Sequence, residues 1–168
     1  MTGPTVRLLR REELDLFAEA LPAWNSREYG KRLASQEQGR LAQLVAWDRD
    51  LPVGRAMLVF PGHEEWSISA HRENCPEVRD VMVAATHRRR GVATSLMAAI
   101  EQVAQDGGWS RVGLSVSLDG DATAARALYE RLGYHPAHGP YIFSTMLEAE
   151  DGSSFAVGAV MAYLVKRW

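Results

Sequence analysis

Apolar residues recur along this chain with two different spacings, and the changes of spacing mark the expected elements. After residue 91 they fall three and four residues apart, as on one face of a helix, until the Gly107-Gly108 pair ends the pattern. Two apolar runs on either side of the polar segment 48–50 predict a β-hairpin. The same reasoning predicts strands over residues 6–10, 41–47, 52–60, 81–83, 111–118, 141–147 and 157–165, and helices over 12–21 and 26–34, after residue 91 and up to residue 133.

One junction between these elements joins a strand, a basic turn and the start of a helix. Three consecutive arginines, Arg88 to Arg90, follow the strand and are followed at once by Gly91 and the helix. The first backbone N–H groups of a helix have no partner inside it, and the helix dipole is positive at that end. The junction is therefore predicted to bind a phosphate without a metal. A solvated charge run or a nonspecific polyanion patch is the alternative.

Two motifs carry a resemblance to a known family. The spacing Arg88-x-x-Gly91-x-Ala93, directly after the strand, resembles the cofactor-binding motif of the GNAT superfamily of acetyl-CoA-dependent N-acetyltransferases. The segment 125–134, with its Leu-Tyr pair and closing Gly-Tyr pair, resembles the second signature of that family. A short glycine pattern alone has many false positives, whereas two motifs in the right order and at the right distance favour the family.

The resemblance implies an α/β (α+β) fold and a single domain over residues 1–168. The expected architecture is a central mixed, mostly antiparallel sheet of six to seven strands, flanked by about four helices. It also implies a splay between the strand through Val83 and the strand over 111–118, which leaves backbone groups free to bind a ligand.

The resemblance further implies acetyl-CoA as the co-substrate, held mainly by backbone groups. The N–H groups of the turn from Arg89 to Thr94 would hold the pyrophosphate. The strand before the turn would offer its backbone to the pantetheine arm and one N–H to the thioester oxygen. The residues expected to bind the cofactor are Val81, Met82, Val83, Arg88, Arg89, Arg90, Gly91, Val92, Ala93 and Thr94.

The implied reaction is direct attack of a primary amine on the thioester in a ternary complex. Tyr129 falls at the tyrosine of the second signature, where its hydroxyl can reach the leaving sulfur. A phenol with a pKa near ~10 is a weaker acid than a thiol near ~8.5, so a hydrogen bond to the thiolate is expected rather than full proton donation. Plain core packing is the alternative, because Tyr129 also lies on an apolar helix face.

The general base has two candidates, Glu77 and Asp80. The family most often has an acidic residue where this chain has Arg79, and side-chain alternation along a strand places Glu77 on the same face as Arg79. Each carboxylate could equally be a solvated charge at the end of the strand. Three histidines titrate in the useful range and are expected in loops: His71, His135 and His138.

One departure from the second signature concerns the start of its helix. Ala122 stands where the family often has an asparagine, and Asp121 or Thr123 could cap the helix instead, with Asp121 the predicted N-cap. Together with Arg79, this departure leaves open a different class of function. The alternative is a noncatalytic module that binds or senses acyl-CoA.

Composition excludes several other classes of protein. The 168 residues are 46% hydrophobic, which is enough for one core, and the net charge of −2 argues against a nucleic-acid binder. No apolar run approaches the roughly 20 residues that a membrane span needs. A single cysteine, Cys75, allows no internal disulfide, and the cytoplasm is the expected compartment. No histidines are paired at metal spacing, so no metal is predicted.

The sequence indicates only the chemical class of the acceptor. A group of acidic residues before and at the cofactor strand fits a cationic amine, either a small molecule or the N-terminus or a lysine of a peptide or protein. An exposed loop is the alternative for this group, which consists of Glu64, Glu65, Glu73, Glu77 and Asp80. The candidate pocket aromatics, with core packing as the alternative, are Trp24, Tyr29, Trp66 and Tyr141. Dimers are common in the family, and the last strand could join a homodimer through Phe155, Val157, Val160 and Leu164.

Overall fold

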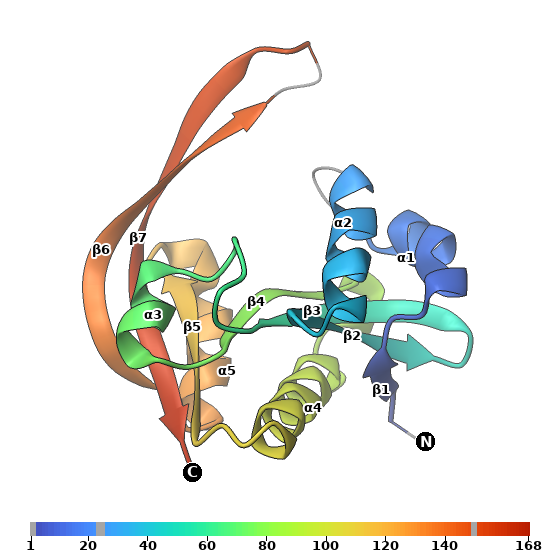
Figure 1. The fold of residues 1–168 in the computed structure, drawn as a ribbon, viewed down its shortest axis with the longest axis horizontal. Helices are drawn as coiled ribbons and strands as arrows, with labels where there is room; N and C mark the ends of the chain where they lie inside the picture. Colours follow the sequence, from blue (N-terminus) through green and yellow to red (C-terminus); the bar gives the residue numbers. More distant parts are fainter. Residues whose placement is uncertain (1–2, 23–25, 149–150) are drawn as a thin grey trace.

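A twisted sheet with helices on both faces organises the protein in the computed structural model, which describes residues 3–22, 26–148 and 151–168 (Figure 1). In chain order the elements are β1 (Thr5–Leu8), a 3-10 turn (Arg11–Glu13), α1 (Leu14–Ala20), α2 (Ser26–Glu37), β2 (Leu41–Asp48), β3 (Leu51–Val59), α3 (Ile68–Glu73), β4 (Glu77–Val83), a 3-10 turn (Ala85–His87), α4 (Val92–Asp106), β5 (Arg111–Ser117), a 3-10 turn (Gly120–Ala122), α5 (Thr123–Arg131), β6 (His135–Glu148) and β7 (Ser154–Arg167).

The sheet confirms the expected fold class. Within the described residues it has seven strands in the order β1-β2-β3-β4-β5-β7-β6, and every neighbouring pair is antiparallel except β4 and β5. The described part contains five α-helices where about four were expected. The additional one is α3, whose six residues are too few to show a periodic stripe. The Ser67 side chain caps it by accepting a hydrogen bond from the Ala70 N–H.

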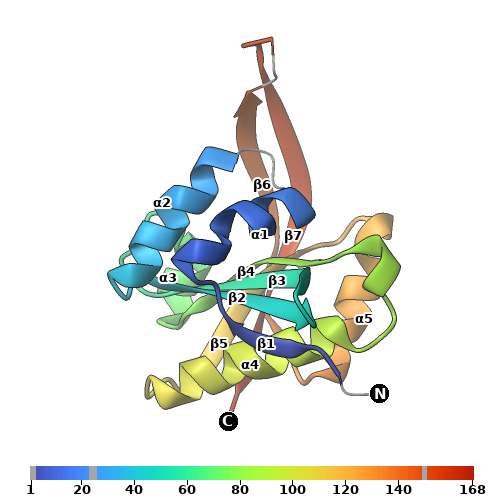
Figure 2. The ribbon, with the colours of Figure 1, turned by 90° about the vertical axis from the view of Figure 1, so that its right-hand side faces the viewer.

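Side-chain alternation along the strands contributes to two larger apolar cores on opposite faces of the sheet. On β2, Leu44 and Ala46 face the core covered by α4 and α5, whereas Val45 and Trp47 face the core under α1 and α2. Figure 2 shows these helix pairs on opposite sides of the sheet. The predicted stripe of α4 is confirmed, because Leu96 and its neighbours on that face are buried. Full burial of one such leucine contributes roughly 1.5–3 kcal/mol.

The two central parallel strands separate after only two residue pairs. β4 and β5 pair at Glu77 with Gly113 and at Val78 with Leu114, although both strands continue for several more residues. This confirms the expected splay. On its other side β4 stays paired with β3 through a bulge, where Asp80 takes a positive φ of 56°. The bulge turns the backbone of β4 at the point where it leaves β5.

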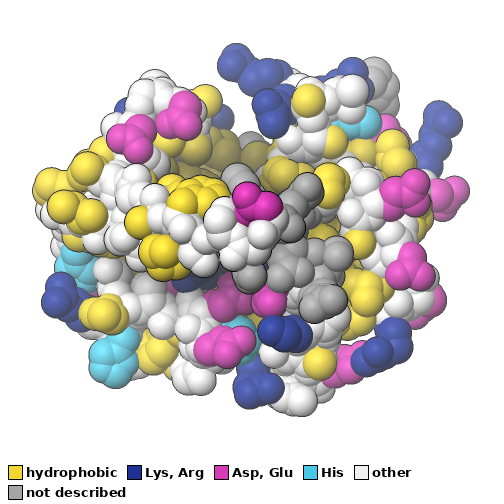
Figure 3. All heavy atoms as spheres, turned by 90° about the horizontal axis from the view of Figure 1, so that it is seen from above, with side chains coloured by type: hydrophobic (Ala, Val, Ile, Leu, Met, Phe, Trp, Pro, Cys, Tyr) yellow, Lys and Arg dark blue, Asp and Glu magenta, His cyan; other side chains and the backbone are white. Residues whose placement is uncertain are grey.

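β6 and β7 form a long hairpin that projects beyond the rest of the sheet (Figures 1 and 2). We call its outer part, residues 141–148 and 154–160, the arm. Its side chains are largely apolar and exposed, with Ile142 at 80% and Met146 at 62%, and Figure 3 shows hydrophobic side chains gathered there. Phe155, Val157 and Val160 are also exposed, whereas Leu164 is buried in the main core and cannot contribute to an interface. The homodimer itself stays a prediction.

Three local expectations were wrong. The three histidines expected in loops lie in regular elements: His71 in α3, and His135 and His138 in β6. β6 begins six residues earlier than predicted, because its first half pairs with the buried part of β7. Asp121 is not the N-cap of α5, because Asp121 lies inside the 3-10 turn that precedes this helix. None of the helices in the described part of the chain is long and apolar enough to cross a membrane.

Candidate active site

The turn between β4 and α4 has the backbone conformation of an anion cradle. Gly91 is the N-cap of α4 with φ 79°, and Arg89 has φ 62°. A side chain at Gly91 would meet no neighbour, so glycine is favoured there by the left-handed backbone and not by lack of space. The first hydrogen bond inside the helix runs from Ser95 N to Gly91 O at 3.0 Å. The N–H groups just before Ser95 therefore have no partner in the helix and are available to a ligand.

A cavity of about 590 Å³ opens at this turn, between the start of α4 and one side of α5. Arg88 is oriented there by a 3.2 Å hydrogen bond from its Nε to the carbonyl of Val83. Arg131 of α5 adds a further cation that the sequence motif did not reveal. The lining residues are Val83, His87, Arg88, Arg89, Gly91, Val92, Ala93, Thr94, Ala124, Ala127, Leu128 and Arg131. Cationic side chains and free amides in one cavity suit a diphosphate.

Seven of the ten residues predicted to bind the cofactor thus lie around one cavity. Arg90 is exposed and does not line it. Val81 and Met82 lie on the splayed part of β4, where their side chains pack into the two cores on opposite faces of the sheet. Because these side chains are packed in the cores, only the backbone of β4 is able to contact a ligand in the split between β4 and β5.

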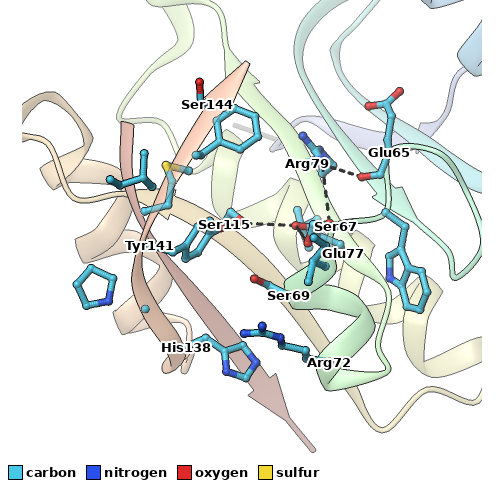
Figure 4. A pocket seen from close by; sticks show the side chains of 18 of the residues that line it. Glu65, Ser67, Ser69, Arg72, Glu77, Arg79, Ser115, His138, Tyr141 and Ser144 are labelled. Carbon is cyan, nitrogen blue, oxygen red and sulfur yellow. Dashed lines mark hydrogen bonds and ion pairs between the residues drawn. The ribbon is translucent and has the colours of Figure 1, made fainter. Parts of the chain in front are cut away.

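A second cavity, of about 910 Å³, lies on the other side of the split (Figure 4). We call it the acceptor cavity. The segment before α3 and α3 itself form one wall, β4 and β5 form the floor, and the start of the arm forms the opposite wall. The lining residues are Glu64, Glu65, Trp66, Ser67, Ile68, Ser69, Arg72, Glu77, Val78, Arg79, Asp80, Ser115, His138, Gly139, Pro140, Tyr141, Ile142, Phe143, Ser144 and Met161.

Glu77 is a buried carboxylate in the floor of the acceptor cavity, with 1% of its side chain exposed. Ser67 donates to it twice, from its backbone N–H and from its hydroxyl, both at 3.0 Å. The Ser115 hydroxyl donates to the same carboxylate at 3.3 Å. Arg79 lies 3.9 Å away and donates a 2.7 Å hydrogen bond to the carbonyl of Glu65. The negative charge of Glu77 is therefore supported mainly by neutral donors.

Asp80 has a different environment, although it is only three residues away. Both of its oxygens accept hydrogen bonds from Arg55, at 2.9 and 3.0 Å, and one of them also accepts from Arg32 at 3.1 Å. Arg55 is itself buried and donates to the Leu21 carbonyl at 2.6 Å and to the Tyr29 hydroxyl at 2.7 Å. This network ties the bulge of β4 to β3 and to the N-terminal helices.

Comparison with known proteins identifies the arrangement. The profile of the acetyltransferase (GNAT) family matches residues 7–134, which is more than half of the chain. This chain belongs to the GNAT family. It is therefore an acetyltransferase of the GNAT type.

Solved structures of other GNAT proteins share the fold at low sequence identity. The ribosomal-protein-alanine N-acetyltransferase of Brucella melitensis is 17% identical, with a TM-score of 0.67 over 98% of this chain and 99% of that one. The PaiA N-acetyltransferase of Thermoplasma acidophilum, in complex with coenzyme A, is 13% identical, with a TM-score of 0.67 over 99% and 100%. A GNAT acetyltransferase of Elizabethkingia anophelis with acetyl-CoA bound is 13% identical, with a TM-score of 0.61 over 100% of both chains. A search of curated proteins found no significant match.

Tyr129 of this GNAT acetyltransferase lies on α5, beside Leu128 of the first cavity. It is 8% exposed and packs edge-on against Tyr134, with ring centroids 6.0 Å apart. Burial raises the pKa of its phenol to about 12. Its hydroxyl makes no hydrogen bond within the described part of the chain. The contacts fit core packing, and the unbonded hydroxyl fits a donor to a ligand, so the catalytic role stays a prediction.

The other candidate residues of the GNAT acetyltransferase divide between cavity and core. Trp66 and Tyr141 line the acceptor cavity, whereas Tyr29 is buried under the N-terminal helices and Trp24 lies outside the described residues. Four of the five acidic residues line this cavity. The fifth, Glu73, forms ion pairs with Arg167 at 2.8 Å and Arg111 at 3.5 Å, and lies 3.0 Å from Nε2 of His138.

Ser67 and Ser115 were missed by the sequence reasoning. For Ser115 a weak signal existed, because a polar residue interrupts the apolar strand Val112–Val116. Nothing in the sequence places either serine beside Glu77, since the three residues come together only when α3, β4 and β5 are assembled.

Proposed function

We propose that this GNAT acetyltransferase moves the acetyl group of acetyl-CoA to a primary amine by direct attack in a ternary complex. The observation that carries this proposal is that β4 contributes to both cavities. Val83 at its end lines the cavity with the anion cradle, and Glu77 to Asp80 form the floor of the acceptor cavity. A thioester held along β4 between these points would meet an amine that enters from the opposite side.

The cofactor would be held chiefly by backbone amides and by positively charged side chains. The diphosphate fits the amides that open α4, with Arg88, Arg89 and Arg131 near its oxygens. The pantetheine arm fits the split, where β4 no longer pairs with β5 and its backbone can bond to amide groups of the arm. A backbone N–H near the bulge would polarise the thioester carbonyl, because the charge that develops on this oxygen needs a fixed donor.

Glu77 is the general base that the geometry favours over Asp80. An alkylamine is mostly protonated at neutral pH, because its pKa lies near ~10, so a proton must leave before or during attack. Both oxygens of Asp80 are already occupied by guanidinium groups that hold the bulge. The bonds to Glu77 come from a backbone amide and hydroxyl groups, which can remain after the carboxylate accepts a proton.

Tyr129 would stabilise the departing thiolate by a hydrogen bond. With a pKa raised to about 12, its phenol stays protonated throughout the neutral range and remains a donor. Complete proton transfer to a thiolate whose thiol has a pKa near ~8.5 would be uphill by roughly 5 kcal/mol. The donor role is therefore favoured over the role of a general acid.

Thiol release from acetyl-CoA in the presence of a panel of primary amines tests this function. We expect release that depends on the amine, acetylation of the amine detected by mass spectrometry, and intersecting initial-rate lines, since both substrates bind before chemistry. A noncatalytic acyl-CoA sensor would bind coenzyme A in calorimetry without any amine-dependent release. Parallel initial-rate lines would instead indicate an acetylated enzyme and contradict direct attack.

A further inference from the structure

A row of hydroxyl groups connects the wall of the acceptor cavity with the buried carboxylate of Glu77. The Tyr141 hydroxyl donates to Ser115 Oγ at 2.8 Å, and the Ser115 hydroxyl donates to Glu77 Oε1 at 3.3 Å. Figure 4 shows these three side chains side by side, with Tyr141 on the wall and Ser115 and Glu77 in the floor of the cavity. They come from β6, β5 and β4, so only the folded sheet brings them together.

We propose that Tyr141 and Ser115 carry the proton of the acceptor amine to Glu77. This inference rests on the proposed function and adds the route by which the proton reaches the base. Glu77 is 1% exposed, so an amine in the cavity has almost no direct access to it. Tyr141 is half-buried and lines the same cavity, where its oxygen can accept a hydrogen bond from the amine.

The direction of the hydrogen bonds suits this transfer. Both hydroxyl hydrogens point towards the carboxylate, so each group can accept a proton on its oxygen while it passes its own proton on. The amine N–H bond breaks and an O–H bond forms on Tyr141. The original protons of Tyr141 and Ser115 move one place each, and the last O–H bond forms on Glu77. The ammonium group thus loses one proton and becomes the neutral amine, Glu77 gains one proton, and the two hydroxyls are unchanged.

Attack of the amine and departure of the sulfur complete the balance. The nitrogen lone pair of the neutral amine forms the new C–N bond, and the electron pair of the broken C–S bond leaves with the sulfur of coenzyme A. The second proton of the attacking nitrogen passes to this sulfur, so that the products are the amide, the thiol of coenzyme A and protonated Glu77. The proton on Glu77 then returns to solvent by the same path. No oxidant, reductant or further reactant is required.

The surroundings of Glu77 keep the end of the path in place. Ser67 holds the carboxylate through its amide and hydroxyl, which leaves the bond from Ser115 as the connection to the cavity. The charged or titratable groups near the carboxylate are Arg79 on β4, Tyr141 on β6, and the buried Cys75 and Tyr163. Arg79 lies 3.9 Å from the carboxylate.

Removal of either hydroxyl should interrupt the path. We expect Tyr141→Phe and Ser115→Ala each to lower kcat for a simple alkylamine by about 100-fold, within the range for loss of a proton-transfer group. The KM for acetyl-CoA should stay within about twofold, because neither residue lines the cavity at the start of α4, which we call the cofactor cavity. The double variant should be little slower than either single variant, since both groups serve one path.

Two matched variants control for general damage. Tyr134→Phe removes a phenol hydroxyl that bonds to Glu101, and Ser117→Ala removes a hydroxyl on the same strand as Ser115 that bonds to Asp119. Both should retain the wild-type kcat. Ser115→Thr, which keeps a hydroxyl at the same place, should recover most of the rate lost in Ser115→Ala. Thermal melts would show that all variants are folded.

The basicity of the acceptor separates a proton path from a packing role. With an alkylamine and its β-fluorinated analogue as probes, the rate loss in Tyr141→Phe should be large for the basic amine and at least tenfold smaller for the fluorinated one. A weakly basic amine releases its proton to water more readily and needs the path less. A packing defect would slow both amines equally.

The outcomes distinguish the relay from the function on which it rests. If the wild type turns over and Tyr141→Phe behaves like Tyr134→Phe, or if both amines lose rate equally, the relay is overturned and the acetyltransferase function stands. If the wild type binds coenzyme A but acetylates none of the amines, both proposals are overturned.

Discussion

The two cavities on either side of β4 are built in opposite ways. The cofactor cavity takes most of its lining from one continuous stretch, Val83 to Thr94, together with one side of α5. The acceptor cavity draws on five separate segments, from Glu64 in the loop before α3 to Met161 in β7. A diphosphate can be bound by the amides of a single turn, whereas an amine and its proton need side chains that approach from several directions. The cofactor site is therefore a local structure, and the acceptor site is a product of the whole sheet.

The largest expected effect distinguishes the two carboxylates of the acceptor cavity. Glu77→Gln should lower kcat by about 100- to 1,000-fold and leave the affinity for coenzyme A unchanged, because it removes the proposed base and touches nothing in the cofactor cavity. Steady-state kinetics and calorimetry on the same preparation measure both quantities.

Asp80→Asn should act mainly on stability. It leaves the buried Arg55 without its charged partner and should lower the free energy of unfolding by about 2 kcal/mol in urea titration. A larger loss of kcat in Asp80→Asn than in Glu77→Gln, with both variants folded, would reverse our assignment of the base.

The next effect concerns the local backbone of the cofactor turn. Gly91→Val should weaken coenzyme A binding about 30-fold in calorimetry, because a β-branched residue at φ 79° distorts the amides that bind the diphosphate. Gly152→Val is the matched control. It imposes the same strain at φ 81° in the tip of the arm, with equally open surroundings, and should leave binding intact. Equal losses in both variants would show that the turn has no special part in binding.

Charge in the cofactor cavity should have a smaller effect. Arg89→Gln should weaken coenzyme A binding about tenfold at low salt, and the difference from wild type should shrink as salt is added. Arg90→Gln should weaken it less, because Arg90 is exposed and does not line the cavity. A larger loss of affinity in Arg90→Gln than in Arg89→Gln would mean that the turn changes conformation when the cofactor binds.

The smallest predicted effect belongs to Tyr129. Tyr129→Phe should lower kcat about fivefold, as expected for loss of one hydrogen bond to a developing thiolate, without changing the KM of the amine. The raised pKa of about 12 predicts that this contribution persists to pH 10 and beyond, where an ordinary tyrosine would ionise. A fivefold difference that disappears between pH 9 and pH 10 would contradict the buried phenol as the donor.

The same raised pKa has a consequence for stability. The unfolded chain loses the Tyr129 proton near pH ~10 and the folded chain only near pH 12, so the contribution of this phenol is fully present below pH ~10 and is lost as the pH rises towards 12. Unfolding of Tyr129→Phe should depend less on pH in this range than unfolding of the wild type.

Much of the fold was predictable because its signals are local. The stripe of α4, the glycine pair after it and the basic turn before it are all readable within some twenty residues, and the structure places them as expected. α3 was not predicted, since six residues carry no period and its cap Ser67 resembles any loop serine. The early start of β6 was hidden by Pro136, Gly139 and Pro140, which usually indicate a loop.

By itself the sequence determined the family, the order of the main elements and the turn suited to the cofactor phosphates, because each depends on neighbouring residues and on the free amides of one helix. Only the tertiary structure distinguishes the surroundings of Glu77 from those of Asp80, which look alike in the chain. One carboxylate is buried and accepts hydrogen bonds from Ser67 and Ser115, and two guanidinium groups from β3 and α2 bind the other. The chemistry of a carboxylate depends on the groups around it, and those groups come from strands and helices that are distant in the sequence.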